Sequence, residues 1–414
     1  AKIIAGLARM LRDVGPAEEL AHDALVAALE QWPASGVPDN PGAWLMATAK
    51  HRAIDLIRRK ALHARKQDEI AHEIDSQWQD SAPDPIATLD DDIGDDLLRL
   101  IFTACHPVLS KDARVALTLR LLGGLTTDEI ARAFLLPEPT VAQRIVRAKR
   151  TLAEARVPFE VPRAEQLAER LSSVLEVIYL IFNEGYAATA GDDWTRPALC
   201  DEALRVGRIL AGLAPNEPEV HGLVALMEIQ ASRLRARIGA DGEPVLLLDQ
   251  NRARWDRLLI GRGLAELARA EALAHADGSG SGPYALQAAI AACHARARTA
   301  EETDWTRIAA LYAALAQRAP SPIVELNRAV AMAMAFGPAA GLELVDTLVS
   351  EPSLANYHLL PSVRGDLLAK LGRNTEASAE FKRAAELTRN ARERKLLLER
   401  AAACVRASAT STSP

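Results

Sequence analysis

The chain has 414 residues, 49% of them hydrophobic and 25% charged, and a net charge of −6. At ~150 residues per domain this length predicts two or three domains, and the composition excludes a largely disordered protein. No uninterrupted apolar run reaches 18 residues, so we expect no membrane span and no membrane partner. The chain begins at Ala1 with no initiator Met and no secretory signal, so we expect a trimmed N-terminus.

The cysteines exclude two common kinds of site. Cys105, Cys200, Cys293 and Cys404 lie about a hundred residues apart and form no CxxC pair. This spacing is typical of neither a disulfide framework nor a zinc site, so we expect a cytoplasmic protein without a metal. The motifs of zinc proteases, serine hydrolases, P-loop enzymes and dinucleotide-binding enzymes are absent as well. We therefore expect no catalytic residue, no cofactor and no enzymatic activity.

Charge is segregated along the first 156 residues. Residues 50–66 carry seven basic side chains and one acidic side chain, a net charge of +6. Residues 68–96 carry eleven acidic side chains and no Lys or Arg, a net charge of −11. Residues 132–156 carry six basic and two acidic side chains, a net charge of +4. Two basic segments that flank an acidic one indicate a highly charged partner.

Nearly every segment favours helix, because Ala, Leu, Arg and Glu dominate and no long β-branched alternation occurs. We predict an all-α fold with two small helical domains followed by a large helical-repeat-like domain. Pro and Gly clusters divide the chain into a helical unit at residues 1–66 and an acidic linker at residues 67–97. A second helical unit follows at residues 98–157, and an all-helical region occupies residues 163–407.

Residues 126–152 carry a helix-turn-helix pattern. Thr126 and Glu129 have the spacing of a capping box, and Pro139 suits the start of a second helix after the Leu135–Pro137 break. One face of that second helix is apolar, with Val141, Ile145, Ala148 and Leu152. Its other face carries Thr140, Gln143, Arg147 and Arg150, with Arg144 at the edge.

Such a face suits the DNA major groove, where Arg reads guanine and Gln reads adenine. The alternative interpretation is an ordinary amphipathic helix of a bundle, with its polar face in solvent.

The first unit contains a second basic helix, predicted over residues 44–60, whose polar side carries Lys50, Arg52, Arg58 and Arg59. Residues 33–42 precede it and are too rich in turn formers for a helix. An acidic amphipathic helix is predicted to start at Pro16. Taken alone, the basic helix is equally compatible with a solvated surface.

Together, these motifs resemble sigma factors of the sigma-70 class, specifically the extracytoplasmic-function group, which keeps only regions 2 and 4. Residues 17–23 are similar to the acidic helix of region 2, and residues 44–59 to its second motif, which begins with Trp-Leu and ends with Arg-Arg. Residues 125–149 are similar to the recognition motif of region 4, so the resemblance covers roughly residues 1–157. The chain departs from the family pattern with His22 in place of Gln and His51 in place of Asn.

The resemblance implies a transcription initiation factor that binds core RNA polymerase and promoter DNA. It implies that the polymerase contacts Glu18, Glu19, Leu20 and Asp23. It implies that region 2 holds the minus-10 element, with a flipped base in residues 33–42, through Asp39, Asn40, Trp44, Lys50, His51, Arg52, Arg58 and Arg59. It implies that region 4 reads the minus-35 element through Thr140, Gln143, Arg144, Arg147 and Arg150, while the acidic linker follows a basic channel of the polymerase.

The C-terminal region shows one repeat-like unit. The residues Gly365, Leu368, Gly372, Ala377, Phe381 and Ala384 match tetratricopeptide spacing, and residues 321–348 form a more degenerate copy around Gly337. Arrays of this kind present a concave face to a peptide or protein. A subgroup of the resembled sigma factors carries a C-terminal helical-repeat extension that controls activity. We therefore expect this region to regulate the chain, with a protein or peptide as its partner.

Two alternatives stay open. The first is a helix-turn-helix regulator whose large domain senses a ligand or protein without binding polymerase. The second is a helical enzyme built around residues 183–186 and other polar-aromatic clusters that contain Trp194, Trp255 and Trp305. We favour explaining these clusters as helix ends, with Gly185 as a C-terminal cap and Asp192 and Asp304 as N-terminal caps.

Overall fold

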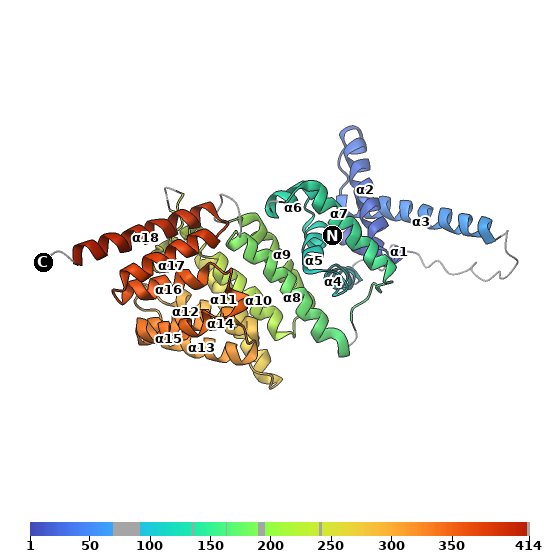
Figure 1. Ribbon diagram of the computed structural model, residues 1–414. Helices are drawn as coiled ribbons and strands as arrows, with labels where there is room; N and C mark the ends of the chain where they lie inside the picture. The colour runs from blue at the N-terminus through green and yellow to red at the C-terminus, as the bar shows by residue number, and fades with distance from the viewer. Residues whose placement is uncertain (69–91, 135, 163, 189–194, 240–241, 412–414) are drawn as a thin grey trace. The chain divides into compact units, whose positions relative to one another are not determined.

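The computed structural model describes residues 1–68, 92–134, 136–162, 164–188, 195–239 and 242–411. Across these residues the named elements are all helices, and one isolated bridge joins Ile238 to Pro244, so the all-α prediction is confirmed. The chain divides into two compact units, unit 1 (Ala1–Ile178) and unit 2 (Tyr179–Pro414) (Figure 1). None of the helices in the described part of the chain is long and apolar enough to cross a membrane.

Unit 1 contains seven α-helices and the start of an eighth among the residues described. They are α1 (Lys2–Leu11), α2 (Val14–Ser35), α3 (Pro41–Asp68), α4 (Asp92–Ala104), α5 (Lys111–Thr118), α6 (Thr127–Phe134), α7 (Glu138–Glu154) and α8 (Ala164–Tyr186), with a π-helical turn η1 (Leu119–Gly123) after α5. Helices α1, α2 and α3 pack on one another, α4 packs on α1, and α5 and α6 pack on α7.

The helix-turn-helix has the predicted construction. The amide of Glu129 donates to Thr126 Oγ1 (3.2 Å) and the amide of Thr126 donates to Glu129 Oε2 (2.7 Å), which confirms the capping box. Helix α7 begins at Glu138, so Pro139 lies in its first turn. Backbone N–H groups there have no intrahelical acceptor, so the missing N–H of proline removes no hydrogen bond. Its buried residues are the predicted stripe Val141, Ile145, Ala148 and Leu152.

The segment between α2 and α3 is shorter than expected. The prediction that residues 33–42 are non-helical is wrong at both ends, because α2 continues through Ser35 and α3 begins at Pro41. After Pro33, the last turn of α2 is closed by hydrogen bonds from Ser35 Oγ to the Gln31 carbonyl and from the Gly36 amide to the Trp32 carbonyl (both 2.9 Å). Helix α2 also starts earlier than Pro16, at Val14, because Asp13 accepts from the Gly15 amide (2.9 Å) as its N-cap.

Within unit 1, a buried carboxylate joins α2 to the helix-turn-helix. Glu18 is 8% exposed. Its Oε1 accepts from Arg120 Nε in η1 (2.5 Å), and its Oε2 is ion-paired with Lys149 of α7. Burial raises the pKa of Glu18, but the hydrogen bonds and charges of Lys149 and Arg120 outweigh it and hold that pKa below its ordinary value. A further ion pair, between Arg9 Nε of α1 and Asp96 Oδ2 of α4 (3.1 Å), joins α1 to α4 within unit 1.

Unit 2 consists of the end of α8 and a series of helices packed as sequential neighbours (Figure 1). They are α9 (Pro197–Leu213), α10 (Pro218–Ala231), α11 (Arg257–Ala276), α12 (Pro283–Arg296), α13 (Trp305–Arg318), α14 (Pro322–Phe336), α15 (Pro338–Leu348), α16 (Leu359–Lys370), α17 (Asn374–Leu387) and α18 (Ala391–Ser411). Short 3-10 turns occupy η2 (Leu234–Ala236), η3 (Leu247–Asp249), η4 (Arg252–Arg254) and η5 (Pro352–Leu354).

The repeat-like segments form helical hairpins. Gly372 (φ 77°) connects α16 to α17, and a Cβ at Gly365 would lie 3.1 Å from the ring of Phe381. Gly337 (φ 101°) connects α14 to α15, and a Cβ at Gly341 would lie 2.5 Å from that of Ala333. Small residues therefore lie where paired helices approach closely. The hairpins agree with the expected turns, while their membership in the tetratricopeptide class stays a prediction.

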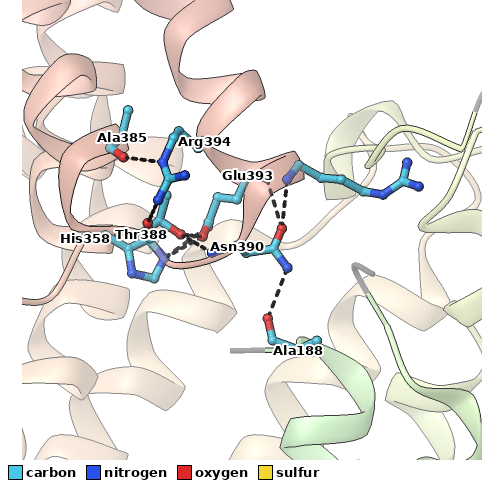
Figure 2. Close-up of polar contacts among 8 residues, drawn as sticks. Ala188, His358, Ala385, Thr388, Asn390, Glu393 and Arg394 are labelled. Atoms are coloured by element: carbon cyan, nitrogen blue, oxygen red, sulfur yellow. Dashed lines mark hydrogen bonds and ion pairs between the residues drawn. The ribbon is translucent and has the colours of Figure 1, made fainter. Parts of the chain in front are cut away.

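A buried polar network lies at the start of α18 (Figure 2). Asn390 Oδ1 accepts from the amides of Arg392 and Glu393 (both 3.1 Å) and caps α18, while its Nδ2 donates to the Ala188 carbonyl (3.4 Å). The Glu393 carboxylate lies 3.0 Å from His358 Nε2 and accepts from Thr388 Oγ1 (2.5 Å). Within unit 2, this network joins the segment after α8 to helices α16 and α18, which are far apart in the sequence.

Replacing Glu18 by Gln removes the negative charge between Arg120 and Lys149. We expect the contact between α2 and α7 to weaken by ~1–3 kcal/mol, because two partly buried cations lose their partner. Hydrogen exchange of the α2 amides measures this weakening, and Glu19→Gln, at the exposed neighbouring position, is the matched control.

The same contact predicts a pH dependence. Because the folded-state pKa of Glu18 lies below its ordinary value of 4.5, its stabilisation is complete above that pH and is lost as the pH falls through the folded-state pKa. Wild-type α2 amides should lose protection in that acidic range, and Glu18→Gln should lack this step. Identical exchange in wild type and Glu18→Gln at every pH would contradict the assignment.

Candidate functional site

The recognition face of α7 borders a groove. Thr140, Gln143 and Arg147 are exposed, and Arg144 is half-buried. These four side chains line a groove of about 360 Å³ together with residues at the start of α5, among them Ser110 and Ala113. The four predicted DNA contacts are therefore brought together on one surface.

Ion pairs distinguish the arginines of this surface. Arg144 Nη2 lies 3.3 Å from Asp112 Oδ2 of α5, which fixes the side chain across the groove. Arg147 forms no ion pair with any residue that the structure describes, so its guanidinium is available to a base or phosphate. Arg150, the fifth predicted contact, is exposed outside the groove lining; its hydrogen bond to Glu154 (2.6 Å) raises its pKa.

The region around the start of α3 presents an aromatic pair. Trp44 packs edge-to-face on Trp32, with ring centroids 5.4 Å apart. Asn40 caps α3 by accepting from the Ala43 amide (3.0 Å), and Asp39 is exposed beside it. Aromatic rings beside a short loop suit the stacking of an unpaired base. Sequence reasoning missed Trp32, although a second Trp at the end of the acidic helix was a visible signal.

The predicted basic side of α3 does not form one surface. His51, Arg58 and Arg59 are exposed. Lys50 is half-buried, and burial followed by the charge of Arg9 lowers its pKa. Arg52 Nη1 lies 3.6 Å from Asp23 Oδ2 of α2. Of the basic residues predicted on α3, only His51, Arg58 and Arg59 are therefore exposed for binding DNA in this arrangement.

The predicted polymerase contacts on α2 are divided as well. Glu19 and Asp23 are exposed and Leu20 is half-buried, whereas Glu18 is committed to Arg120 and Lys149. Beside the two exposed acids lies an apolar patch that sequence reasoning missed, with Leu25 47%, Val26 39% and Leu29 76% exposed. The signal was the choice of residues, because α2 buries alanines such as Ala24 and Ala28 and exposes its larger side chains.

Three remaining predictions concern caps and the linker. Asp304 Oδ1 accepts from the Arg307 amide (2.9 Å), which confirms it as the N-cap of α13. Gly185 is not a C-terminal cap: it lies inside α8, and a Cβ there would lie 2.7 Å from the backbone nitrogen of Cys200, so it allows a close approach. The predicted cap Asp192 and residues 69–91 of the acidic linker lie outside the described residues.

Comparisons with known proteins agree with this arrangement. Residues 2–62 match Sigma-70 region 2, residues 99–152 match Sigma-70 region 4, and residues 170–271 match a family of unknown function, DUF6596. An uncharacterized protein from Rhizobium meliloti (strain 1021) is 44% identical over 389 residues, which cover 94% of this chain and 89% of that protein. No solved structure matches the chain.

The match to both region 2 and region 4 favours a sigma factor over the two alternatives. A helix-turn-helix regulator that does not bind polymerase does not need region 2, and sigma factors are not enzymes. The chain belongs to the sigma-70 family of sigma factors, with regions 2 and 4 followed by a DUF6596 segment, and it binds core RNA polymerase and directs it to promoters.

Proposed function

We propose that the groove between α5 and α7 reads the minus-35 element. The observation that carries this proposal is the grouping of Thr140, Gln143, Arg144 and Arg147 along one groove. Arg147 is the side chain best suited to a guanine, because it is exposed and forms no ion pair among the described residues. Arg150, beyond the groove lining, suits a phosphate contact.

Region 2 would then hold the opened minus-10 element. Trp32 and Trp44 supply a stacking surface beside residues 36–40, and Asp39 and Asn40 lie in that segment. His51, Arg58 and Arg59 supply exposed donors for the separated strand. Lys50 and Arg52 would join them after losing their present neighbours Arg9, Asp96 and Asp23.

Arg147→Ala should reduce promoter-directed transcription by about fivefold or more, because a bidentate guanine contact contributes ~1–3 kcal/mol. Run-off transcription with core polymerase, on a promoter selected by the wild-type chain from a random library, measures the loss. Arg205→Ala, which removes an exposed arginine of α9 in unit 2, should leave transcription unchanged. Equal activity of Arg147→Ala and wild type would remove Arg147 from the recognition surface.

We further propose that the polymerase binds the exposed face of α2. Glu19 and Asp23 lie on this face near the exposed Leu25, Val26 and Leu29. An apolar patch bordered by acids is typical of a protein-binding surface. Glu18 would take part only after separating from Arg120 and Lys149.

The double variant Glu19→Lys/Asp23→Lys should lose most of its retention by immobilised core polymerase, since both charges that border the apolar patch are reversed. Glu271→Lys/Glu343→Lys makes the same change in net charge at exposed positions of unit 2 and should be retained like wild type. Retention of the α2 variant at the wild-type level would place the polymerase contact elsewhere.

We also propose the finer family assignment, the extracytoplasmic-function group with a tetratricopeptide-like extension, and a cytoplasmic site of action, where polymerase and promoters are. The extension would regulate initiation through the first part of α8, which lies in unit 1. Arg170 Nη2 donates to the Phe102 carbonyl (2.8 Å), and Ser173 Oγ donates to the Cys105 carbonyl (2.7 Å). Arg114 of α5 donates to Ser173 Oγ, and Glu176 lies 2.5 Å from Lys111 Nζ.

These contacts connect α8 to the proposed DNA-binding groove through a single helix, α5. Arg114 and Lys111 of α5 are the residues bonded to α8. The residues Ser110, Asp112 and Ala113 around the start of α5 either line the groove or pair with Arg144. A displacement of α8 would therefore change the position of α5 and the shape of the groove. A regulatory protein or peptide bound to the helical hairpins of unit 2 would act through this helix.

Ser173→Ala removes the hydroxyl that bonds both Arg114 and the Cys105 carbonyl. We expect initiation per polymerase-bound chain to fall about fivefold or more, because loss of two buried hydrogen bonds costs ~1–3 kcal/mol and loosens α5. Ser172→Ala is the matched control, since Ser172 is the exposed neighbour on the same helix. Wild-type initiation by Ser173→Ala would contradict regulation through this contact.

A further inference from the structure

Three guanidinium groups gather around two aromatic rings inside unit 2. Arg233 Cζ lies 5.7 Å from the ring centroid of Trp255 and 5.8 Å from that of Tyr186. Arg252 lies 4.9 Å from the same Trp255 ring, and Arg237 lies 3.8 Å from Tyr186. Arg233 and Arg252 are only 8% and 7% exposed. Cation–π contacts recover only part of the cost of burying such charges.

The two buried arginines, Arg233 and Arg252, differ in their hydrogen bonds. Arg252 donates to the carbonyls of His294 (2.5 Å) and Ala297 (2.9 Å) and to Thr303 Oγ1 (3.0 Å), so it stabilises the segment after α12. The Arg233 side chain makes no hydrogen bond or ion pair with any part of the chain that the structure describes, and its Nε is buried without a partner. A buried guanidinium without an anion is unfavourable unless something else supplies the negative charge.

Other buried polar atoms near Arg233 are also without partners among the described residues. They are Trp255 Nε1, which is a donor, and His294 Nδ1. Burial, followed by the charges of Arg233 and Arg252, lowers the pKa of His294 to about 3, so the imidazole is neutral. Burial, followed by the charge of Arg233, also lowers the pKa of Arg252. Arg233, Trp255 and His294 therefore form a positively charged group in which Arg233 has no anion among the residues that the structure describes.

We propose that Arg233, with Trp255 Nε1 and His294 beside it, forms a binding site for a small organic carboxylate. The planar guanidinium matches a carboxylate with two parallel hydrogen bonds, and the indole N–H supplies another donor. Tyr186, which is half-buried beside Arg233, would contact the apolar part of the ligand. This inference rests on the regulatory role proposed for the C-terminal extension, because the bound carboxylate would be the signal that the extension responds to.

Full-length protein with sodium benzoate tests the site, with sodium phosphate and sodium chloride at equal ionic strength as the other arms. Saturating benzoate should raise the Tm of wild type by about 2 °C or more. It should do the same for Arg235→Met, the exposed position two residues away, and should leave the Tm of Arg233→Met unchanged. Equal stabilisation of Arg233→Met, or stabilisation by phosphate alone, would overturn a carboxylate site at Arg233.

The ligand-free protein supplies a second measurement. If Arg233 is kept for an external anion, Arg233→Met should raise the Tm without ligand, because an unpaired buried charge is replaced by an apolar chain of similar length. A fall in the Tm of Arg233→Met, with no benzoate effect on wild type, would show a purely structural cation. Both readouts are independent of transcription, so a failure here is distinguishable from failure of the Ser173 experiment.

Discussion

The carboxylate of Glu18 is the interaction on which the arrangement of unit 1 depends. It is a buried negative charge from α2 held between Arg120, which precedes the helix-turn-helix, and Lys149, which lies in its second helix α7. Since a buried charge is tolerated only when it is paired, this contact fixes α2 against α7. It also buries Glu18 and pairs it with Lys149, so neither side chain is exposed in this arrangement. Charged side chains of regions 2 and 4 therefore pair with each other within unit 1.

The remaining exposed surfaces are the ones for which separate tasks are proposed above. The groove beside α7 keeps Arg147 unpaired among the described residues, and α2 keeps Glu19, Asp23 and its large apolar side chains exposed. Helix α8 contributes Arg170, Ser173 and Glu176 to the packing of unit 1. The segment that matches DUF6596 begins at residue 170, so this family starts on a helix that packs against region 4.

Local signals were sufficient for several elements. The capping box at Thr126 and Glu129, the Pro at the start of α7 and its apolar stripe depend only on residues within a few turns, and each prediction is confirmed. The turn at residues 36–40 was predicted too long, because the hydrogen bonds that close the last turn of α2 after Pro33 are not visible in a count of turn formers. Gly185 was misread for a related reason: the close approach of Cys200 comes from another helix.

The sequence by itself determined the all-α class, the helix-turn-helix and the motifs of regions 2 and 4. Periodicity, caps and residue order depend only on residues that are close together in the chain. Only the tertiary structure decided which charged side chains remain available. Glu18 and Glu19 are adjacent and chemically identical, yet one is buried against two cations and the other is exposed. Likewise, Arg233 and Arg235 are two residues apart, and only Arg233 is buried over aromatic rings. Pairing and burial depend on residues distant in the chain, which no local pattern specifies.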